Sequence, residues 1–403
     1  MRLCLSFLAL GLWLYGGPSA HGQTPSPDFQ QCLAGLQDQA RRQGRSKETV
    51  DVLIPELVQQ DRVLELDRQQ PEFMQTFGRY LSIRVTDTRI VVGREKLAAN
   101  RALLESLQQR YGVPAAVLVA FWGLETNYGA YLGATPSLEA LATLACDPRR
   151  SEFFSTEFLT ALKLLEQEEL DPFSMRGSWA GAMGHTQVMP STWDRYAVDG
   201  DGDGRLDLWA SEADALASGA NFLSQLGWVA GLRWGREVLL PAEFDYALAG
   251  DGTRRPLEAW DGLGIRQANG EPLPRAKVEA KLVVPAGAEG PAFLVYRNFD
   301  VIMGWNRSES YALSVGLLAD RIAGRPGLVQ APPNDEALRV EDVERLQRAL
   351  ADRGFDPGPA DGIWGPATRR ALTEFEASVG RVADGYPDPD TLGVLLDGDT
   401  SGP

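Results

Sequence analysis

The chain has 403 residues, with 39 Lys and Arg against 55 Asp and Glu, and a formal net charge of −16. Apolar residues make up 44% and charged residues 23%, which is typical of a globular protein, and the length is enough for two or three domains. The negative charge argues against nucleic acid as a partner, because nucleic-acid binders carry a basic footprint. Only two histidines occur, His21 and His185, which argues against a Ser-His-Asp triad and a histidine zinc site. Acid–base chemistry is therefore expected to use carboxylates.

Residues 1–22 are predicted to be a signal peptide. Arg2 precedes an apolar run over residues 3–15, and Ala20-His21-Gly22 fits a cleavage site with small residues. Cys4 lies before the apolar run, so it is not the position of a lipoprotein cysteine. An uncleaved membrane anchor is the alternative, although the run is short for a bilayer span. After cleavage we expect a soluble periplasmic protein without a membrane anchor.

Two cysteines remain after this cleavage, Cys32 and Cys146. Cysteines of exported proteins often pair, because their compartment is oxidising. The sequence therefore predicts a Cys32–Cys146 disulfide, and a pair of buried free thiols is the alternative.

Residues 28–230 are expected to be mostly helical. The predicted helices cover 28–43, 84–111, about 114–127 with Gly129 as the stop signal, 137–145 and 151–169. Residues 235–300 contain two short β-like runs, 238–241 and 281–285, and predict a small sheet inserted before a last helix over 310–322. A linker over 326–337, rich in Gly and Pro at its start, follows, and residues 338–397 carry the apolar pattern of another small domain.

Glu125 is the first candidate for chemistry, and it lies in the segment Phe121-Trp122-Gly123-Leu124-Glu125-Thr126-Asn127-Tyr128-Gly129. The carboxyl group comes at the end of a very apolar helix, where burial disfavours the charged form and raises the pKa. A carboxylic acid that stays protonated near neutral pH can protonate a leaving glycosidic oxygen. An ordinary exposed glutamate near a helix end is the alternative.

Two further segments have the residue types of a carbohydrate site. In residues 178–193, small residues let the main chain approach a ligand closely, and Trp179 and Trp193 could stack on sugar rings. A tight loop for helix packing is the alternative. In residues 296–312, aromatic residues alternate with amides and hydroxyls, and Asn306-Arg307-Ser308 also matches the short glycosylation sequon.

The segment from Asp199 to Asp207 has the pattern of an EF-hand calcium loop. Carboxylates occupy loop positions 1, 3, 5 and 9, glycine occupies position 6, and the Arg205 carbonyl is available at position 7. Carboxylates packed this densely would repel one another without a cation. Position 12 of the loop 199–210 is Ala210, where a bidentate glutamate is usual, so Glu212 or water would complete the coordination. A solvated Asp/Gly turn is the alternative.

Together these segments resemble the MltB-type family of lytic transglycosylases over residues 28–325. The resemblance implies a mainly α fold, with a lysozyme-like helical catalytic domain over residues 23–325 and a β-containing insertion at about 235–300. It implies cleavage of peptidoglycan strands to 1,6-anhydromuramoyl ends without an organic cofactor, in which Glu125 is the catalytic acid and base. The substrate contacts that carry over are Tyr128, Ser178, Trp179, Gln187, Trp305, Asn306 and Tyr311. A structural Ca²⁺ site is also a family feature, and it carries over to Asp199, Asp201, Asp203, Arg205 and Asp207.

Residues 338–397 resemble the small three-helix peptidoglycan-binding domain. The most specific segment is Asp361-Gly362-Ile363-Trp364-Gly365-Pro366-Ala367-Thr368. Its apolar positions are expected to build the core of this domain in any case. The implied partners are peptidoglycan glycan strands and other enzymes of the cell wall.

Two other functions remain open on the sequence alone. A lysozyme-type hydrolase would use water as the acceptor, and a second carboxylate roughly 5 or 8 Å from Glu125 would favour it. Glu139 and Asp147 are the candidates for that carboxylate. A non-catalytic protein that binds the cell wall would need only the tail. The sequence leaves open whether cutting is internal or at strand ends, how peptide stems contribute, and the oligomeric state.

Overall fold

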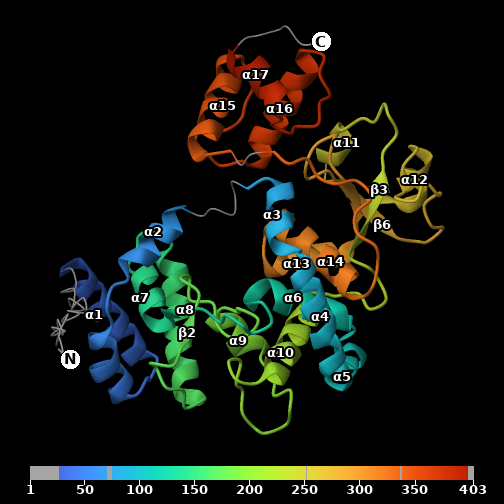
Figure 1. The fold of residues 1–403 in the computed structure, drawn as a ribbon. Coiled ribbons are helices and arrows are strands. Elements are labelled where there is room, and N and C mark those ends of the chain that lie inside the picture. The colour runs from blue at the N-terminus through green and yellow to red at the C-terminus, as the bar shows by residue number, and fades with distance from the viewer. Residues whose placement is uncertain (1–26, 70–74, 251, 336–337, 398–403) are drawn as a thin grey trace, which may run out of the picture.

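The computed structural model describes residues 27–69, 75–250, 252–335 and 338–397, so the predicted signal peptide lies outside the described residues. The described chain forms a helical body, a small sheet inserted before the last two helices of that body, and a group of three C-terminal helices (Figure 1). The helices of the first part are α1 (Pro27–Arg42), α2 (Asp61–Gln69), α3 (Phe77–Arg84), α4 (Asp87–Ala99), α5 (Arg101–Tyr111), α6 (Ala115–Thr126), α7 (Ser137–Ala145), α8 (Ser151–Gln167), α9 (Pro190–Tyr196) and α10 (Glu212–Gln225). Thr49–Leu53 forms a π-helical turn and Ile54–Glu56 a 3-10 turn between α1 and α2. The expected mainly α fold is confirmed.

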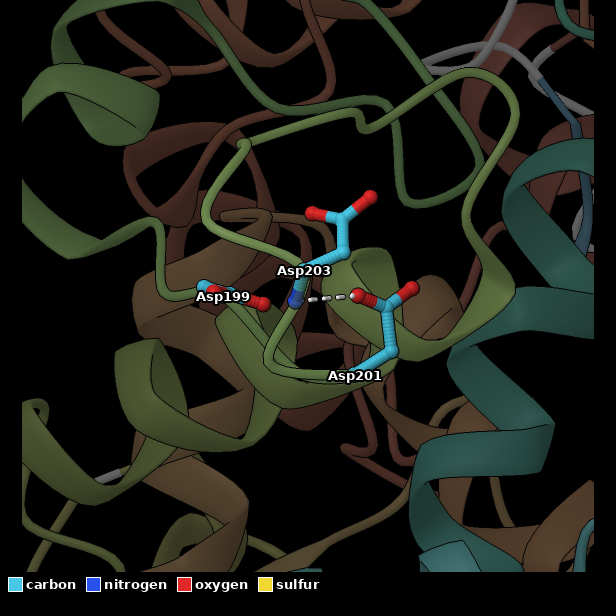
Figure 2. A group of neighbouring side chains, drawn as sticks. All are labelled: Asp199, Asp201 and Asp203. Carbon is cyan, nitrogen blue, oxygen red and sulfur yellow. Dashed lines mark hydrogen bonds between the residues drawn. The ribbon is translucent and has the colours of Figure 1, made fainter.

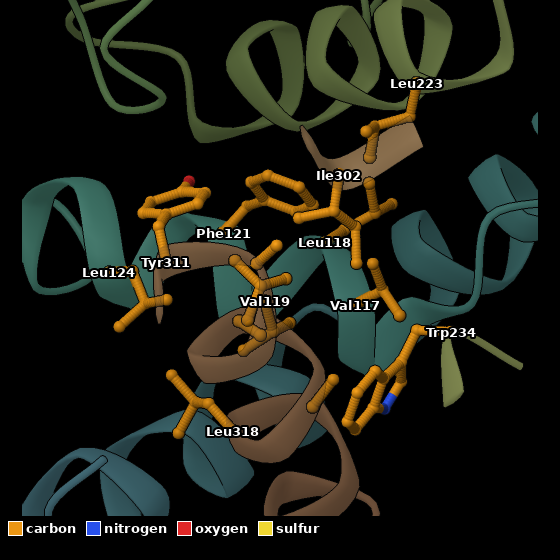
Figure 3. Close-up of a cluster of buried hydrophobic side chains, with 14 of the residues drawn as sticks. Val117, Leu118, Val119, Phe121, Leu124, Leu223, Trp234, Ile302, Tyr311 and Leu318 are labelled. Atoms are coloured by element: carbon orange, nitrogen blue, oxygen red, sulfur yellow. The ribbon is translucent and has the colours of Figure 1, made fainter. Parts of the chain in front are cut away.

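The helical body has two hydrophobic cores. One lies among α1, α7, α8 and α9 and is built on buried residues that include Leu141, Phe158 and Trp193. A disulfide between Cys32 and Cys146 joins α1 to the end of α7 in this part. The other core surrounds α6, whose residues from Val117 to Leu124 are all buried because the helix is apolar on every side (Figure 3).

The long helix expected within 84–111 is wrong, because the structure divides it at Asn100 into α4 and α5. Asn100 has φ −100° and ψ 21°, and its side chain donates to the carbonyl of Lys96 and to the carboxylate of Glu212. Asparagine competes with the helix by binding nearby polar groups, so it can end one helix and begin the next. The sequence periodicity continues through the break because both helices turn apolar faces to the same core.

The sheet has the strand order β4-β6-β7-β3-β5, and all neighbours are antiparallel. Its strands are β3 (Gly235–Leu239), β4 (Arg255–Pro256), β5 (Arg266–Gln267), β6 (Glu279–Val283) and β7 (Ala292–Val295), with α11 (Ala247–Gly250) and α12 (Leu257–Gly262) in the connections. Strand β7 is buried on both faces, since Phe293 and Val295 join the core around α6 while Ala292 and Leu294 join a separate core beneath α12. This alternation fastens the sheet to the helical body.

Two helices return the chain from the sheet to the helical body. They are α13 (Arg297–Trp305) and α14 (Glu309–Ile322), and α14 packs along α6. Ser308 begins α14, because its hydroxyl accepts the amide of Tyr311. The junction of α13 and α14 therefore lies against the end of α6, where Glu125 is found. Within the described ranges, every helix is too short or too polar to traverse a lipid bilayer.

The C-terminal group consists of α15 (Val340–Asp352), α16 (Pro366–Ser378) and α17 (Pro389–Asp397), around a core that includes Leu346, Leu372 and Phe375. Buried Gln347 organises the loop between α15 and α16, because its amide donates to Asp361, Ile363 and Thr368 and its oxygen accepts the amide of Gly362.

The C-terminal group touches the rest of the chain through its last loop. The Asp384 carboxylate accepts the amide of Ala288 at 2.6 Å, and the Tyr386 hydroxyl donates to Asp335 at 2.8 Å. The preceding linker is also held, since the Glu237 carboxylate on β3 accepts the amides of Val329 and Gln330. The C-terminal helices are thus fixed against the sheet in this structure.

Candidate active site

Glu125 lies at the C-terminal end of α6, on the border between core and solvent. Helix α6 stops there because Asn127 adopts a left-handed conformation, with φ 50° and ψ 49°. Tyr128 and Gly129 also have positive φ, so the chain reverses within three residues. The sequence analysis expected Gly129 as the stop signal, but the residue that ends the helix is Asn127. Asparagine tolerates this conformation better than most residues, and such strain is typical of functional sites.

Two side chains from the junction of α13 and α14 bind the same oxygen of Glu125. Trp305 Nε1 donates to Glu125 Oε1 at 3.1 Å, and the Tyr311 hydroxyl donates to the same atom. Burial, with the neighbouring Glu125 carboxylate as the second cause, raises the pKa of Tyr311 well above its usual range. The phenol therefore keeps its proton and acts as a donor. The sequence analysis expected both residues as sugar contacts, and the structure places their polar atoms on the catalytic candidate.

Aromatic rings support this arrangement from below. The ring of Phe121 lies 4.6 Å from that of Trp305 and 6.2 Å from that of Tyr311, measured between centroids, and Figure 3 shows Phe121 and Tyr311 side by side above the core. Phe222 of α10 packs on Trp305 as well, at 5.1 Å. Because protein rings already pack on the indole of Trp305, its N–H is the group that it offers to the site.

The segment that follows strand β2 (Arg176–Gly177) lies next to the turn after Glu125. Strand β2 pairs with β1 (Thr135–Pro136), and Gln187 Nε2 donates to the carbonyl of Leu132 at 3.0 Å, just after that turn. Ser178 closes the loop by accepting the amide of Ala182. A Cβ on Gly181 would lie 2.4 Å from the side chain of Leu141, so the loop packs closely on α7. Gln187 is therefore held next to the segment that follows the Glu125 turn, while Ser178 is fixed within its own loop. The loop is also the tight packing loop of the alternative interpretation.

The remaining predicted contacts divide into two groups. Trp179 and Asn306 are half-buried, and the Asn306 side chain accepts the amide of Ser308 at the start of α14. Tyr128 is 5% exposed, and its hydroxyl donates to the carbonyl of Arg89 at 2.6 Å, so its side chain joins α4 to α6. Trp193 is 1% exposed, so the expected stacking of its ring on a sugar is wrong.

The two carboxylates considered as partners of Glu125 are engaged elsewhere. Glu139 on α7 accepts a hydrogen bond from Gln60. Asp147 accepts from Arg149 at 3.1 Å, and the side-chain hydrogen bond of Arg149 lowers the pKa of Asp147. Neither interaction involves α6, so these contacts give no support to a paired-carboxylate hydrolase.

The aspartate loop projects from the helical body between α9 and α10. Carboxylate oxygens of Asp199, Asp201 and Asp203 lie within 4.8 Å of one another (Figure 2). The Asp199 carboxylate accepts the amides of Gly202 and Gly204, which lowers the pKa of Asp199 and keeps it ionised. The donor set of clustered carboxylates suits a hard divalent cation.

The end of this loop, residues 207–212, differs from what the sequence analysis expected. Glu212 does not turn to the loop, since its carboxylate pairs with Lys96 at 2.7 Å on α4. The Asp207 carboxylate accepts the amides of Trp209 and Ala210. Ser211 supplies an unexpected contact, because its hydroxyl donates to Asp201 at 2.8 Å.

Two residues of this region were missed as functional by the sequence analysis. Asp214 is fully buried, and its two carboxylate oxygens accept the amides of Gly200 and Asp207, so it closes the loop from beneath. The sequence analysis considered His185 only when it argued against histidine chemistry. In the structure this residue lies between the aspartate loop and the Glu125 turn. Burial lowers the pKa of His185, so its imidazole is neutral. The loop pattern could not have pointed to Asp214, because it ends at Ala210 and Asp214 lies in the first turn of α10.

Comparison with known proteins assigns both parts of the chain. A family model described as Transglycosylase SLT domain matches residues 28–320, and one described as a peptidoglycan binding domain matches residues 339–395. Membrane-bound lytic murein transglycosylase B of Escherichia coli is 36% identical over 232 residues, which are 56% of this chain and 60% of that relative. The match thus spans less than two thirds of that relative's length.

Solved structures extend the similarity over nearly the whole chain. SltB3 from Pseudomonas aeruginosa, crystallised with NAG-anhNAM-pentapeptide, is 44% identical, with a TM-score of 0.87 that covers 92% of this chain and 100% of SltB3. Escherichia coli Slt35, crystallised with calcium, is 30% identical, with a TM-score of 0.63 over 74% of this chain and 93% of Slt35. The chain therefore belongs to the SLT-domain family of lytic transglycosylases, joined here to a peptidoglycan-binding domain.

Proposed function

We propose that this enzyme cleaves the β-1,4 bond between N-acetylmuramic acid and N-acetylglucosamine in peptidoglycan and leaves 1,6-anhydromuramoyl ends. The observation that carries the proposal is the Glu125 carboxylate, held at Oε1 by Trp305 and Tyr311 at the end of a buried helix. The anhydro sugar in the SltB3 complex supports the same outcome here.

The hydrogen bonds to Glu125 suggest separate roles for its two oxygens. Since Oε1 accepts from Trp305 and Tyr311, we propose that the acidic proton is carried by Oε2. Glu125 gives this proton to the bridging oxygen as the bond from that oxygen to the muramoyl anomeric carbon breaks. The carbon becomes oxocarbenium-like, or is trapped by the sugar's own N-acetyl group. The Glu125 carboxylate then takes the proton of the 6-hydroxyl, whose oxygen attacks the anomeric carbon and closes the 1,6-anhydro ring.

Product analysis tests the reaction directly. Mass spectrometry of sacculi digested by the full chain should find muramoyl ends in the anhydro form. A hydrolase would release reducing ends, each heavier by one water. Reducing ends as the main product would overturn the transglycosylase proposal and favour the hydrolase.

Substrate binding is proposed for four other residues. The residues proposed to position the sugars are Ser178, Trp179, Gln187 and Asn306.

A divalent cation, proposed to be Ca²⁺, belongs to the aspartate loop. Asp199, Asp201 and Asp203 would hold it through their carboxylates, with the Arg205 carbonyl and Asp207 completing the loop pattern. When bound, the cation offsets the mutual repulsion of these carboxylates and stabilises the folded loop. Calcium in the Slt35 crystals supports the choice of ion.

Replacing Asp201 and Asp203 together by Ala should remove the calcium response. A ligand that binds only the folded state stabilises it by about 2.7 kcal/mol at a hundredfold excess over its Kd. The wild type should therefore melt at a higher temperature as calcium is added, while the double variant should melt at one constant temperature. Differential scanning calorimetry over a calcium series measures both. A rise of equal size in the variant would show that the ion binds elsewhere.

Export and partnership are also proposed. The Cys32–Cys146 disulfide favours an oxidising compartment, and we propose the periplasm, where peptidoglycan is found. Other enzymes of the cell wall are proposed as partners because the substrate is shared. Cell fractionation with an antibody to the chain tests the location.

Removing residues 338–403 is expected to leave an active catalytic domain that binds sacculi less well. The truncation keeps Val329 and Gln330 bound to Glu237, so this contact of the linker with β3 is retained. Cutting of short soluble strands should persist, because Glu125, Trp305 and Tyr311 all precede the linker. Pull-down with insoluble sacculi compares the two forms. Equal retention of both would contradict a binding role for the C-terminal helices.

A further inference from the structure

His185 connects the aspartate loop to the Glu125 turn through its main chain. Its amide donates to the carbonyl of Leu208 at 2.9 Å, immediately after the last aspartate of the loop. Its carbonyl accepts the hydroxyl of Thr126 at 2.7 Å, immediately after Glu125. One residue thus bridges two segments that lie more than 70 residues apart along the chain.

The imidazole of His185 adds a second connection to the catalytic helix. It is 8% exposed, and its Nδ1 accepts the indole N–H of Trp122 at 3.0 Å. Trp122 precedes Glu125 by three residues on α6, and the two rings meet edge to face at 5.7 Å. A Cβ on Gly129 would lie 2.3 Å from the imidazole Cε1, so the ring fills the space beneath the turn.

The contacts on the loop side leave little room for independent movement. Buried Asp214 accepts the amides of Gly200 and Asp207, each at 2.8 Å, which fixes the two ends of the loop to one carboxylate. A Cβ on Gly184 would lie 2.5 Å from the carbonyl oxygen of Leu208, so this carbonyl occupies the space that a side chain next to His185 would need. Packed interiors pass such displacements on to their neighbours.

We propose that His185 is a positioning residue that couples cation occupancy of the aspartate loop to the placement of the Glu125 turn. The inference rests on the proposed cation site and on the proposed role of Glu125. A cation that draws the carboxylates together fixes Asp207 and the carbonyl of Leu208, and His185 passes that position to Thr126 and Trp122. Such coupling is reciprocal, so a ligand of the active site must tighten cation binding by the factor by which the cation tightens that ligand.

Calorimetric titration of the full chain measures this factor. Calcium is titrated with and without saturating NAG-anhNAM-pentapeptide, and the muropeptide is then titrated with and without calcium. We expect both dissociation constants to fall by the same factor, within the range of about 5-fold to 150-fold found for coupled sites. Equal calcium affinity in the two states of the wild type would overturn the inference.

The His185→Phe variant tests the imidazole. Phenylalanine retains an aromatic ring but cannot accept from Trp122, so the coupling factor should fall at least threefold, while calcium still binds. His185→Asn can place an acceptor at the position of Nδ1 and should recover part of the factor. Trp260→Phe is the matched control, because it removes a buried indole bond, to the carbonyl of Ala280, outside this path. Undiminished coupling in His185→Phe would overturn the inference.

A measurement on the wild type needs no variant. Of the two histidines, His21 belongs to the predicted signal peptide, so the ¹⁵N-imidazole resonance of His185 is identified in protein from which that peptide has been cleaved. The Nδ1 signal should shift with calcium in proportion to the calorimetric saturation, and a constant signal would overturn the inference. Absence of any calcium heat would overturn the cation site together with this coupling, while the product analysis would still decide the proposed reaction.

Discussion

Replacement of Glu125 by Gln is expected to suppress the release of anhydromuropeptides almost completely. Glutamine has nearly the same size and can still accept from Trp305 and Tyr311, but it cannot donate or take the proton. General acid–base catalysis contributes about 10²–10⁴-fold. In the proposed mechanism one group serves both steps, so the loss should reach or exceed the top of that range. Turnover of soluble strands, followed by chromatography of the products, measures it.

Glu139→Gln is the matched control for this experiment. It makes the same chemical change on a carboxylate that binds Gln60 and was the candidate second group of a hydrolase. The Glu125 variant should melt near the wild type and still bind strands, and the Glu139 variant should keep its activity. More than about a tenth of the activity in Glu125→Gln would place the proton donor elsewhere. An equal loss in Glu139→Gln would indicate a pair of carboxylates.

Opening the disulfide is expected to cause the largest loss of stability. The cross-link joins residues 114 positions apart, and a closed loop of about 100 residues is worth roughly 4.7 kcal/mol in the chain-entropy model. Exchange of Cys32 and Cys146 for Ser should lower the free energy of unfolding by several kcal/mol, because the unfolded chain gains freedom. Urea denaturation of the double variant measures the change.

Reduced wild-type protein provides the control for the serine variants. Dithiothreitol should lower the urea midpoint of the wild type to that of the double variant and leave the variant unchanged. The truncated form without residues 338–403 should show the same loss, since both cysteines belong to the first core. A difference below about 1 kcal/mol would mean that the unfolded chain stays compact around α1 and α7.

Much of the fold could be predicted because local signals agree with the tertiary structure. Ser137–Ala145 was expected with the bounds that the structure has, and the last helix differs by one residue at its start. The break at Asn100 could not be predicted, because it depends on contacts with Lys96 and with Glu212 from α10. A helix break that depends on a carboxylate far away in the sequence leaves no local sequence pattern.

The candidate site could be proposed from the sequence where residue type restricts the chemistry. Glu125 and the aspartate loop could be singled out because few residue types supply a proton or bind a hard cation. The hydroxyl of Tyr128 could not be assigned to Arg89, nor that of Tyr311 to Glu125, since both bonds form between helices far apart in sequence. Sequence motifs indicate the type of chemistry, and the packing of the helices decides which side chains contact the site.

The hydrogen bonds from the linker to Glu237 affect how the catalytic site and the C-terminal helices act together on one glycan strand. For a freely jointed tether, the effective concentration of one module near the other spreads over many geometries. Here two consecutive linker amides are bound to β3, and Asp384 is bound to Ala288. One distance between the C-terminal helices and the catalytic site therefore dominates. A glycan held by the C-terminal helices would meet Glu125 in a preferred register, counted in disaccharides from the point of attachment.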